Sequence, residues 1–388
     1  MLDFDFYNPT RIVFGKDRLV ELDTLVPKGA KVLVLYGGGS VERFGTLEKV
    51  TSALKEREVV TFGGIEPNPK YTTLMKAVEV VKAEKIDFLL AVGGGSVMDG
   101  TKFVSLASGF EGNPEELLAC GFNPVPVEKA LPLGTVVTLP ATGSEMNSGG
   151  VISHNKGKFP VFSPLSFPVF SILDPTLTAT LPPTQVANGI VDTFIHTVEQ
   201  YVTYPVSAGF QDRTAEGILQ TLIEVGEKTL ADPDDYDARA NLVWCATMAL
   251  NGLIGAGVPQ DWTTHMIGHE LTAMFGIDHG KTLAVLQPSI WTLRKEQKRG
   301  KLLQYAERVW GITEGDEESR IDEAIGRTRA FFESLGIRTR LSDYGVTEDK
   351  IDDVVKALEA HGMVALSETG DVTPEVSRRI LAHALHGA

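Results

Sequence analysis

Histidine and carboxylate side chains recur at helical spacing in the second half of the chain. Asp192 and His196 are four residues apart, and so are His265 and His269, so each pair would share one face of a helix. His279 follows ten residues after His269. A carboxylate combined with imidazoles makes a site suited to Fe(II) or Zn(II). We therefore predict a site for one divalent metal.

Two plainer explanations compete with a metal site. A single pair of histidines four residues apart is also found on helices where both rings serve only the packing. A metalloprotease helix has the same spacing, but it needs a glutamate directly after the first histidine, and Met266 stands there. The carboxylate and the additional histidine favour a metal site over both.

Two glycine-rich turns in the first half of the chain suggest a phosphate-bearing ligand. Gly37–Ser40 and Gly93–Ser96 both read Gly-Gly-Gly-Ser and follow short apolar runs. Glycine lets a backbone approach a phosphate, and the following helix N-terminus offers free N–H groups. Neither turn has the Gly-x-Gly-x-x-Gly or the P-loop pattern, so either one alone could be a simple turn at a sheet edge. A third loop, at 138–145, also follows a strand-like run and offers hydroxyls and amides.

The elements that must position these residues change in type along the chain. Up to residue 181, short apolar runs alternate with helical patterns. Continuous apolar strands of this kind are typical of a parallel sheet covered on both faces. The predicted strands are 31–36, 59–62, 87–92, 135–139 and 169–173, and the predicted helices include 41–55 and 74–83. Ligands bind at the carboxyl ends of such strands, which is where both glycine turns lie.

Beyond Pro182-Pro183 the pattern is helical to the end of the chain. Clear amphipathic helices are predicted at 301–309, 319–335 and 350–361. The uncharged stretch from Ala240 to Gln260 contains Asn, Thr, Gly and Pro, so we interpret it as buried helices rather than a membrane span. We predict two domains, an α/β domain at 1–181 and an all-α domain at 182–388.

Composition excludes several classes of partner. The 388 residues carry a formal net charge of −15, with a pI near 5.0. Such a surface disfavours nucleic acids and anionic membranes. Two cysteines, Cys120 and Cys245, make no disulfide framework and fit a reducing cytoplasm, and Cys245 reads as a buried core residue. The N-terminus lacks the pattern of a signal peptide. We expect a cytoplasmic protein.

Two long motifs resemble the iron-containing alcohol dehydrogenase family. The first runs from Ser171-Ile172-Leu173-Asp174 through Pro182, Ala187, Gly189 and Asp192-Thr193-Phe194 to Glu199, and the second surrounds His265, His269 and His279-Gly280. The resemblance extends over essentially the whole chain. The segments 64–69, 91–96 and 139–145 are similar to the branch of butanol dehydrogenases and NADPH-dependent aldehyde reductases.

The resemblance implies a fold, a cofactor and a role for each residue. It implies a Rossmann-like nucleotide-binding domain followed by a helical metal-binding domain, as in dehydroquinate synthase. It implies a homodimer that uses NADP(H) and one Fe2+ or Zn2+ to interconvert short to medium apolar aldehydes and primary alcohols. The implied metal ligands are Asp192, His196, His265 and His279. His269 would lie beside them, near the nicotinamide, where it relays a proton or only packs. The residues implied to line the cofactor cleft are Asn68, Gly94, Gly95, Ser96, Asp99, Thr138, Thr142, Lys158 and Leu181.

Three further features bear on cofactor and substrate choice. Relatives that prefer NAD usually carry Asp where this chain has Gly39, so we predict that Gly38, Gly39 and Ser40 accommodate the 2′-phosphate of NADP. Asp278 stands where many relatives have proline before the last metal ligand. The apolar stretch 249–262 would line the substrate pocket.

Other functions compete with this one. A dehydroquinate synthase-like lyase would also bind NAD and a metal, but it should need a basic cluster for its anionic substrate. The segment 240–290 contains a single lysine or arginine, Lys281. A metal hydrolase is a third reading, and a binding module without catalysis fits least, given so many candidate ligands.

Overall fold

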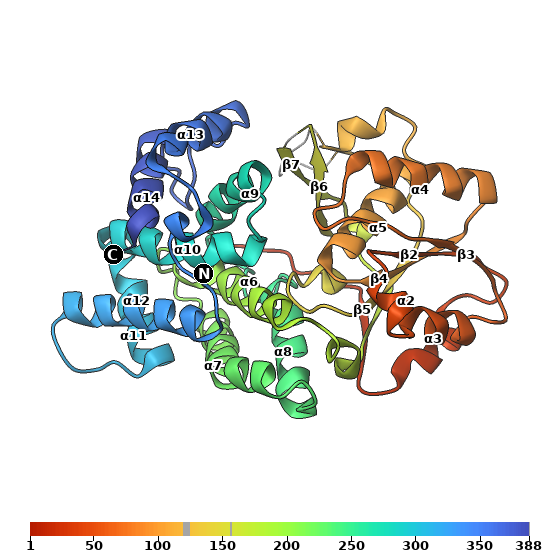
Figure 1. The fold of residues 1–388 in the computed structure, drawn as a ribbon, viewed down its shortest axis with the longest axis horizontal. Helices are drawn as coiled ribbons and strands as arrows, with labels where there is room; N and C mark the ends of the chain where they lie inside the picture. Colours follow the sequence, from red (N-terminus) through yellow and green to blue (C-terminus); the bar gives the residue numbers. More distant parts are fainter. Residues whose placement is uncertain (119–124, 156, 388) are drawn as a thin grey trace. The chain divides into compact units, whose positions relative to one another are not determined.

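The computed structural model describes residues 1–118, 125–155 and 157–387, so Cys120 lies outside the described residues. The chain forms two compact units (Figure 1). We call Tyr7–Leu181 with Pro233–Val243 the α/β unit. The helical unit consists of Met1–Phe6, Pro182–Asp232 and Trp244–Ala388.

A parallel sheet of six strands organises the α/β unit. The strands stand in the order β1-β8-β5-β4-β2-β3, and all their pairings are parallel. Their bounds are β1 Arg11–Phe14, β2 Lys31–Tyr36, β3 Glu58–Phe62, β4 Phe88–Gly93, β5 Leu133–Val137 and β8 Phe170–Leu173. This arrangement confirms the predicted parallel sheet, and it places the carboxyl ends of β2, β4 and β5 side by side.

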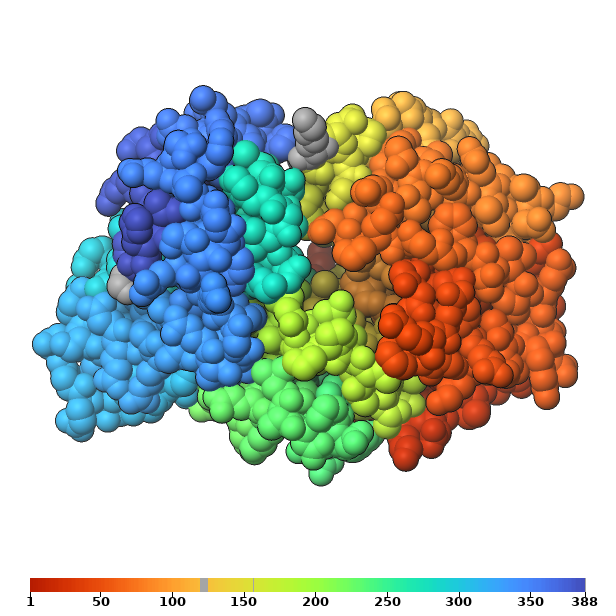
Figure 2. All heavy atoms as spheres, in the orientation of Figure 1, coloured from red at the N-terminus to blue at the C-terminus, as the bar shows by residue number. Residues whose placement is uncertain are grey.

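Alternating side chains of the strands feed two separate apolar cores. Leu33 and Leu35 of β2 belong to the core beneath helices α4 and α5, whereas Val32 and Val34 belong to the core beneath α2 and α3. The helices accordingly cover both faces of the sheet (Figure 1). Their bounds are α1 Leu22–Leu25, α2 Ser40–Arg43, α3 Thr46–Ala53, α4 Tyr71–Glu84 and α5 Gly95–Gly109. In the space-filling view, residues of α2 to α4 form red to orange surface (Figure 2).

The structure corrects the sequence interpretation at three places in this unit. The predicted helix 41–55 is divided into α2 and α3, because Gly45 adopts a left-handed conformation with φ 73°. The edge strand β1 was not predicted. An antiparallel hairpin, β6 Gly149–His154 with β7 Gly157–Phe162, was also missed. Pro160 inside β7 removes a donor and weakens the strand signal.

The helical unit is built around α6 and α10. Helix α6 packs against α7, α9 and α10, and α10 also contacts α12 and α14. The helices are α6 Pro183–Tyr201, α7 Gly209–Ala231, α9 Thr263–Phe275, α10 His279–Leu293, α11 Lys295–Trp310, α12 Glu317–Ser334, α13 Ile351–Ala360 and α14 Pro374–His386. Side chains of α9, α10, α13 and α14 share one apolar core. The predicted helices at 301–309, 319–335 and 350–361 are thus present, with somewhat different ends.

The uncharged stretch 240–260 is only partly helical. Helix α8, Tyr236–Ala249, covers its first half, and residues 250–258 form turns and bends. Our prediction of helix throughout was wrong there, because Gly252, Gly255 and Gly257 favour turns over a continuous helix. Among the described residues, no helix is long and apolar enough to cross a membrane. Cys245, which α8 carries, is buried as expected.

Two segments belong to the unit that their position in the sequence would not suggest. Met1–Phe6 lies with the helical unit, and Pro233–Val243 lies with the α/β unit. The latter is held by Arg239, a buried residue whose guanidinium donates to the Thr178 carbonyl at 3.0 Å and to the Thr178 hydroxyl at 3.2 Å. Leu181 and Pro182 belong to different units.

Candidate metal and cofactor sites

Helix α6 carries three ionisable side chains on one face. Asp192, His196 and Glu199 follow one another at intervals of four and three residues, which places them along a single helical stripe. All three are buried. Pro183 begins the helix at a position where its missing N–H costs nothing. The sequence therefore directs a row of polar groups into the interior of the helical unit.

Three imidazole nitrogens surround one oxygen of Asp192. Its Oδ1 atom lies 3.7 Å from Nε2 of His196, 3.5 Å from Nε2 of His265 and 3.7 Å from Nε2 of His279. The candidate ligand atoms of Asp192, His265 and His279 all lie within 4.8 Å of one another. The four predicted ligands thus converge from α6, α9 and the first residue of α10.

These spacings fit a tetrahedral metal site. Ligands bound at about 2.1 Å in tetrahedral geometry stand about 3.4 Å from each other. Oδ1 of Asp192 and Nε2 of His265 are buried, and within the described chain neither reaches a hydrogen-bond partner of normal geometry. Burying such atoms without a partner is costly. A divalent cation between them would satisfy both, and the donor set of one carboxylate and three imidazoles suits Fe(II) or Zn(II).

The charges of the site are strongly coupled. Burial acts to raise the pKa of the Asp192 carboxyl group, but the surrounding imidazoles outweigh it and hold that pKa well below its usual range. Burial acts to lower the pKa of His265, but the carboxylates of Glu199 and Asp192 raise it to about 9. Asp192 is therefore ionised and available to a cation near neutral pH.

Glu199 is a functional candidate whose contact the sequence did not reveal. It belongs to the motif of α6, but its spacing indicated no role. In the structure its Oε2 atom contacts Nδ1 of His265, and its Oε1 atom accepts a hydrogen bond from the Thr264 amide at 2.7 Å. A carboxylate on the far nitrogen of a ligand histidine orients that ring toward the metal.

A close approach of α6 and α10 explains Gly280. A Cβ atom there would lie 2.6 Å from the carbonyl oxygen of Asn188 in α6. Asp278, the departure from the family pattern, accepts from the Asn188 side chain at 3.2 Å and pairs with Lys281 at 2.6 Å. Asp278 thus fixes the start of α10, where His279 stands.

His269 lies beside the four predicted ligands. Its ring centroid is 5.0 Å from that of His279 and 6.1 Å from that of His265. It is half-buried. The group of converging ligand atoms among the described residues contains Asp192, His265 and His279, and it includes neither His196 nor His269. The role of His269 as a neighbour of the metal rather than a ligand remains a prediction, as does its part in proton transfer.

Three loops at the carboxyl edge of the sheet form the candidate cofactor site. They follow β2, β4 and β5, which are adjacent. The loops after β4 and β5 pack tightly, because a Cβ atom on Gly94 would lie 2.9 Å from Leu139, and one on Gly95 would lie 2.5 Å from Thr142. Nothing lies within 4 Å of a Cβ atom placed on Gly38. The first turn is therefore open beside Gly38, whereas Gly94 and Gly95 are needed for loop packing.

The remaining predicted cofactor residues fall along the same unit. Asn68 has a left-handed backbone, and its amide donates to the Ser96 hydroxyl at 3.2 Å. The Thr138 amide donates to the Gly93 carbonyl at 2.9 Å. Lys158 lies in β7 and acts electrostatically on Asp99. Leu181 is half-buried at the end of the unit. These contacts join the loops to one another, and their cofactor roles remain predictions.

Asp99, a predicted cofactor residue, is joined to the buried Lys102 through the hydroxyl of Ser144. The Asp99 carboxylate accepts from the Ser144 hydroxyl at 2.7 Å and from the Val151 amide at 2.9 Å. Lys102 donates to the same hydroxyl at 2.9 Å and to the Gly149 carbonyl at 2.7 Å. Burial lowers the pKa of Lys102 to about 8. Asp99 therefore ties α5 both to the loop before β6 and to β6 itself.

An acidic side chain stands close to Gly39. Glu42 accepts a hydrogen bond from the Tyr36 hydroxyl at 2.7 Å, and its other oxygen lies 3.4 Å from where a Gly39 Cβ atom would be. Gly39 itself has φ 88°, a conformation that favours glycine. Ser40 begins the short helix α2. The absence of an acidic side chain at Gly39 thus does not leave the turn free of negative charge.

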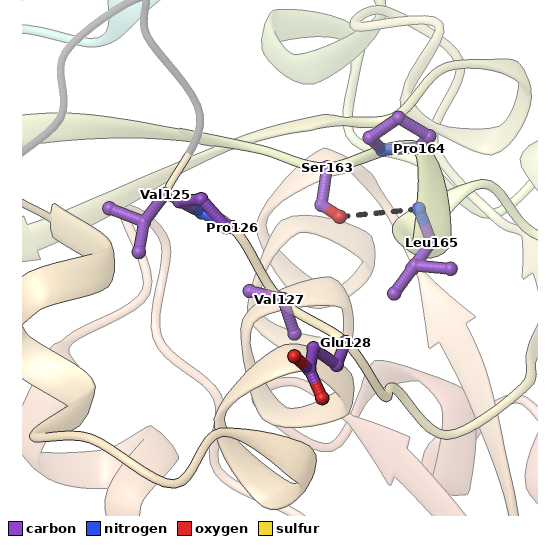
Figure 3. A pocket seen from close by; sticks show the side chains of 7 residues that line it. All are labelled: Val125, Pro126, Val127, Glu128, Ser163, Pro164 and Leu165. Atoms are coloured by element: carbon purple, nitrogen blue, oxygen red, sulfur yellow. Dashed lines mark hydrogen bonds between the residues drawn. The ribbon is translucent and has the colours of Figure 1, made fainter.

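A separate pocket of about 420 Å³ lies in the α/β unit (Figure 3). It is lined by Val125, Pro126, Val127, Glu128, Ser163, Pro164 and Leu165. The Ser163 hydroxyl points toward the Leu165 amide and accepts its hydrogen bond at 3.2 Å. None of the predicted site residues lines this pocket, so it has no part in the sites described above.

Comparison with known proteins gives one consistent answer over the whole chain. The model of iron-containing alcohol dehydrogenases matches residues 9–175, and the model of the C-terminal part of that family matches 186–369. The chain is 57% identical to the NADPH-dependent aldehyde reductase YqhD of Escherichia coli (strain K12), over 98% of this chain and 99% of that protein.

Solved structures agree with the sequence matches. The crystal structure of E. coli K-12 YqhD superposes with a TM-score of 0.97 at 56% identity, over 99% of both chains. A structure of NADH-dependent butanol dehydrogenase A from Thermotoga maritima gives 0.93 at 35% identity, again over 99% of both chains. The two relatives carry names with different cofactors, NADPH and NADH.

Proposed function

The chain belongs to the iron-containing alcohol dehydrogenase family, and from that premise we propose that it reduces aldehydes to primary alcohols with NADPH. It is an oxidoreductase that uses NADP(H) and a divalent metal, Fe2+ or Zn2+, and the reverse reaction oxidises the alcohol. The observation that carries the proposal is the convergence of three imidazole nitrogens on Oδ1 of Asp192, at 3.5 to 3.7 Å.

The residues of the helical unit would divide the work of the reaction. Asp192, His196, His265 and His279 would hold the metal. When bound, the metal supplies Lewis acidity toward the substrate oxygen and the nicotinamide supplies hydride. Reduction also consumes one proton at that oxygen. His269 is our candidate to donate it, since an imidazole titrates near neutral pH and this ring lies beside that of His279.

The residues of the α/β unit would bind the cofactor. Their loops lie at the carboxyl edge of a parallel sheet, where dinucleotides bind in folds of this kind. Backbone amides of the turns at 37–40 and 93–96 would donate to the phosphates, which matters for a protein of net charge −15. We assign dinucleotide binding to 1–181 and metal and substrate binding to 182–388, with Pro233–Val243 as a structural addition to the first.

We propose short to medium apolar aldehydes and alcohols as substrates. The support is the segment 249–262, which carries one ionisable residue, Asp261, and that side chain is paired with Lys298 at 2.8 Å. Polyols would leave hydroxyls unpaired against such a surface. We further propose that the enzyme works as a homodimer in the cytoplasm. Light scattering of the purified protein tests the assembly.

A lyase of the dehydroquinate synthase type is the second candidate, and the site disfavours it. Such an enzyme should offer cations to an anionic substrate. The segment 240–290 contains a single lysine or arginine, Lys281. Its Nζ atom pairs with Asp278 at 2.6 Å. A reaction that returns its cofactor unchanged would also give no net NADPH oxidation.

The deciding experiment measures NADPH oxidation with a panel of aldehydes after reconstitution with Fe2+ or Zn2+. We expect butanal to be reduced with NADPH, and the metal-free protein to be inactive. Glycerol oxidation more efficient than that of butanol would contradict the substrate class. Absence of turnover with every aldehyde, in protein that holds its metal, would exclude the reductase itself.

A further inference from the structure

We propose that Glu199 is a positioning residue that fixes both the backbone and the ring of the metal ligand His265. This inference rests on the proposed function, because it concerns how one ligand of the proposed metal is prepared for binding. It begins from three contacts that a single carboxylate of α6 makes to the start of α9.

The first contacts are to the backbone. Oε1 of Glu199 accepts from the Thr264 amide at 2.7 Å and from the His265 amide at 3.3 Å. These are N–H groups of the first turn of α9, which no partner inside the helix satisfies. Trp262, at the N-cap position, offers no side-chain acceptor. Glu199 thus caps α9 from another helix, and its negative charge suits a helix N-terminus.

The remaining contact is to the ring. Oε2 of Glu199 contacts Nδ1 of His265. A carboxylate only accepts hydrogen bonds, so Nδ1 must carry the proton. A ligand histidine must be neutral, so the proton that leaves is the one on Nε2, and its lone pair is then on the atom that faces Oδ1 of Asp192 at 3.5 Å. Glu199 therefore selects the tautomer that can bind a metal on the side of the other ligands.

A buried charge network holds the segment that precedes His265. The Asp261 amide donates to the Glu199 carbonyl at 2.8 Å, which ties this segment to α6. The Asp261 carboxylate pairs with Lys298 at 2.8 Å, and Lys298 pairs with Glu368 at 3.0 Å. Lys298 and both carboxylate side chains are buried. The lysine thus offsets part of the negative charge near Glu199, and the start of α9 has little freedom to move.

A purely structural role would make Glu199 only a helix cap. The two roles respond differently to Glu199→Gln. Glutamine keeps a side-chain oxygen for the α9 amides, so the cap remains. It removes the charge that fixes the proton on Nδ1 of His265, so ring orientation and metal affinity should change. Metal affinity and stability therefore separate the two roles.

The chain provides a matched control in Glu270→Gln. Glu270 lies on the same helix α9, is buried, and its Oε1 atom is 2.7 Å from Nδ1 of His361. It thus forms a second pairing of a carboxylate with a histidine, but His361 is not a candidate ligand. Both substitutions neutralise a buried glutamate that contacts an imidazole, and only one of them concerns a ligand.

The experiment compares wild type, Glu199→Gln and Glu270→Gln as full-length proteins. Zn2+ affinity is measured by competition with a chromogenic chelator, NADPH affinity by fluorescence and stability by thermal unfolding of the metal-free proteins. We expect Zn2+ affinity to fall about 10- to 100-fold in Glu199→Gln and to stay unchanged in Glu270→Gln. NADPH affinity should be the same in all three.

Two outcomes would count against the positioning role. If Glu199→Gln binds Zn2+ as tightly as wild type, with or without lower thermal stability, Glu199 is a cap and nothing more. A second measurement needs no variant of Glu199. In zinc-loaded wild type with 15N-labelled histidine, His265 should show a protonated Nδ1 and a metal-bound Nε2. The opposite assignment would overturn the inference. If wild type binds neither Zn2+ nor Fe2+, the proposed function fails instead.

Discussion

The Nε2 atoms of His196, His265 and His279 lie 3.5 to 3.7 Å from Oδ1 of Asp192, while the ring centroid of His269 lies 5.0 Å from that of His279. In our proposal the first four residues hold a metal and His269 works beside it. The distinction cannot be drawn from spacing, because His265 and His269 are four residues apart, as are Asp192 and His196.

Substitution of individual histidines tests this distinction. We expect His265→Ala and His279→Ala to lose bound metal and turnover together, because each removes an atom from the coordination group. His269→Ala should retain its metal and lose rate, by roughly 100-fold or more if the ring transfers a proton. Metal analysis and steady-state kinetics of the same preparations provide the measurement. Loss of metal in His269→Ala would mean that ligand and neighbour have been confused.

A second prediction concerns the turn at Gly39 and the preference for NADPH over NADH. Wild type should prefer NADPH to NADH, and Gly39→Asp should weaken NADPH binding far more than NADH binding, because its carboxylate repels a 2′-phosphate. Gly39 has φ 88°, so any side chain there also strains the turn. Gly39→Asn is the matched control, with the same size and tolerance of this conformation but no charge. Fluorescence titration with both cofactors measures the effect. Equal losses for Asp and Asn would assign it to strain alone.

The predictability of the site follows from how local each signal is. Asp192 with His196, and the glycines of the turns, could be recognised because helical periodicity and strand-to-helix turns are properties of short segments. The pairing of Glu199 with His265 joins α6 to α9, so spacing within either helix cannot reveal it. Glu42 was overlooked for another reason. It lies three residues from Gly39, yet only the fold directs its carboxylate back toward that turn.

At the scale of elements, the close approach of α6 to α10 depends on Gly280, which has no side chain. A Cβ atom on Gly280 would lie 2.6 to 3.0 Å from backbone atoms of Asn188, which cannot rotate away. We expect Gly280→Ala to destabilise the fold by about 1–3 kcal/mol. It should also weaken metal binding, because it displaces the helix turn that carries His279.

A glycine in open space provides the control for that experiment. Gly217 is exposed in the middle of α7, and nothing lies within 4 Å of a Cβ atom placed on it. Gly217→Ala should stabilise the protein by roughly 0.5–1 kcal/mol through helix propensity alone. Chemical denaturation and metal titration of both variants check the pair. Wild-type metal affinity in Gly280→Ala would show that α10 adjusts without moving its first residue.

The link between α5 and the loop before β6 gives a pH dependence. Lys102 has a pKa of about 8 in the folded protein, against 10.5 as the ordinary value. Between these pH values the unfolded chain binds a proton that the folded chain has released. The contribution of Lys102 to the free energy of unfolding therefore rises with pH in this window, by up to about 1.4 kcal/mol per pH unit.

Urea denaturation of wild type and Lys102→Met at several pH values measures this contribution. The pH runs from about 7.5 to about 10.5, which spans the folded and the unfolded pKa of Lys102. Methionine keeps the length of the side chain but does not titrate. The stability difference between the two proteins should change with pH in the direction that favours wild type at high pH. A constant difference would mean that Lys102 titrates alike in the folded and unfolded states.

Elements with a strong period were predicted well, and those shaped by tertiary contacts were not. The buried strands β2 and β4 and the amphipathic helices α11 to α13 follow from apolar patterns alone. The division of 41–55 into two helices depends on the backbone of Gly45, and strand β6 of the hairpin packs against α5. No pattern within these segments specifies such contacts.

At the scale of the molecule, the two sets of site residues belong to different units. The predicted cofactor residues all lie in the α/β unit, and the predicted metal ligands all lie in the helical unit. We expect a strong chelator to abolish turnover while NADPH fluorescence titration still shows binding, because the cofactor loops contain none of the ligands. Readdition of Fe2+ or Zn2+ should restore activity. Complete loss of NADPH binding on metal removal would argue against this separation.

The overall architecture was the most predictable level of all. A succession of apolar strands and helices followed by helices alone indicates a parallel sheet and a helical unit, and both are present. The return of Pro233–Val243 to the α/β unit could not be foreseen. It depends on Arg239 reaching Thr178, a contact between segments far apart in the sequence.

That return has a consequence for how the protein is made. The last piece of the α/β unit leaves the ribosome about 60 residues after Leu181, which at 5–20 residues per second is a delay of roughly 3–12 s. During this time the nascent sheet lacks the guanidinium that satisfies the Thr178 carbonyl. Folding of this unit therefore cannot proceed in simple order from one end, because the whole of α6 and α7 must emerge before Pro233–Val243 completes it.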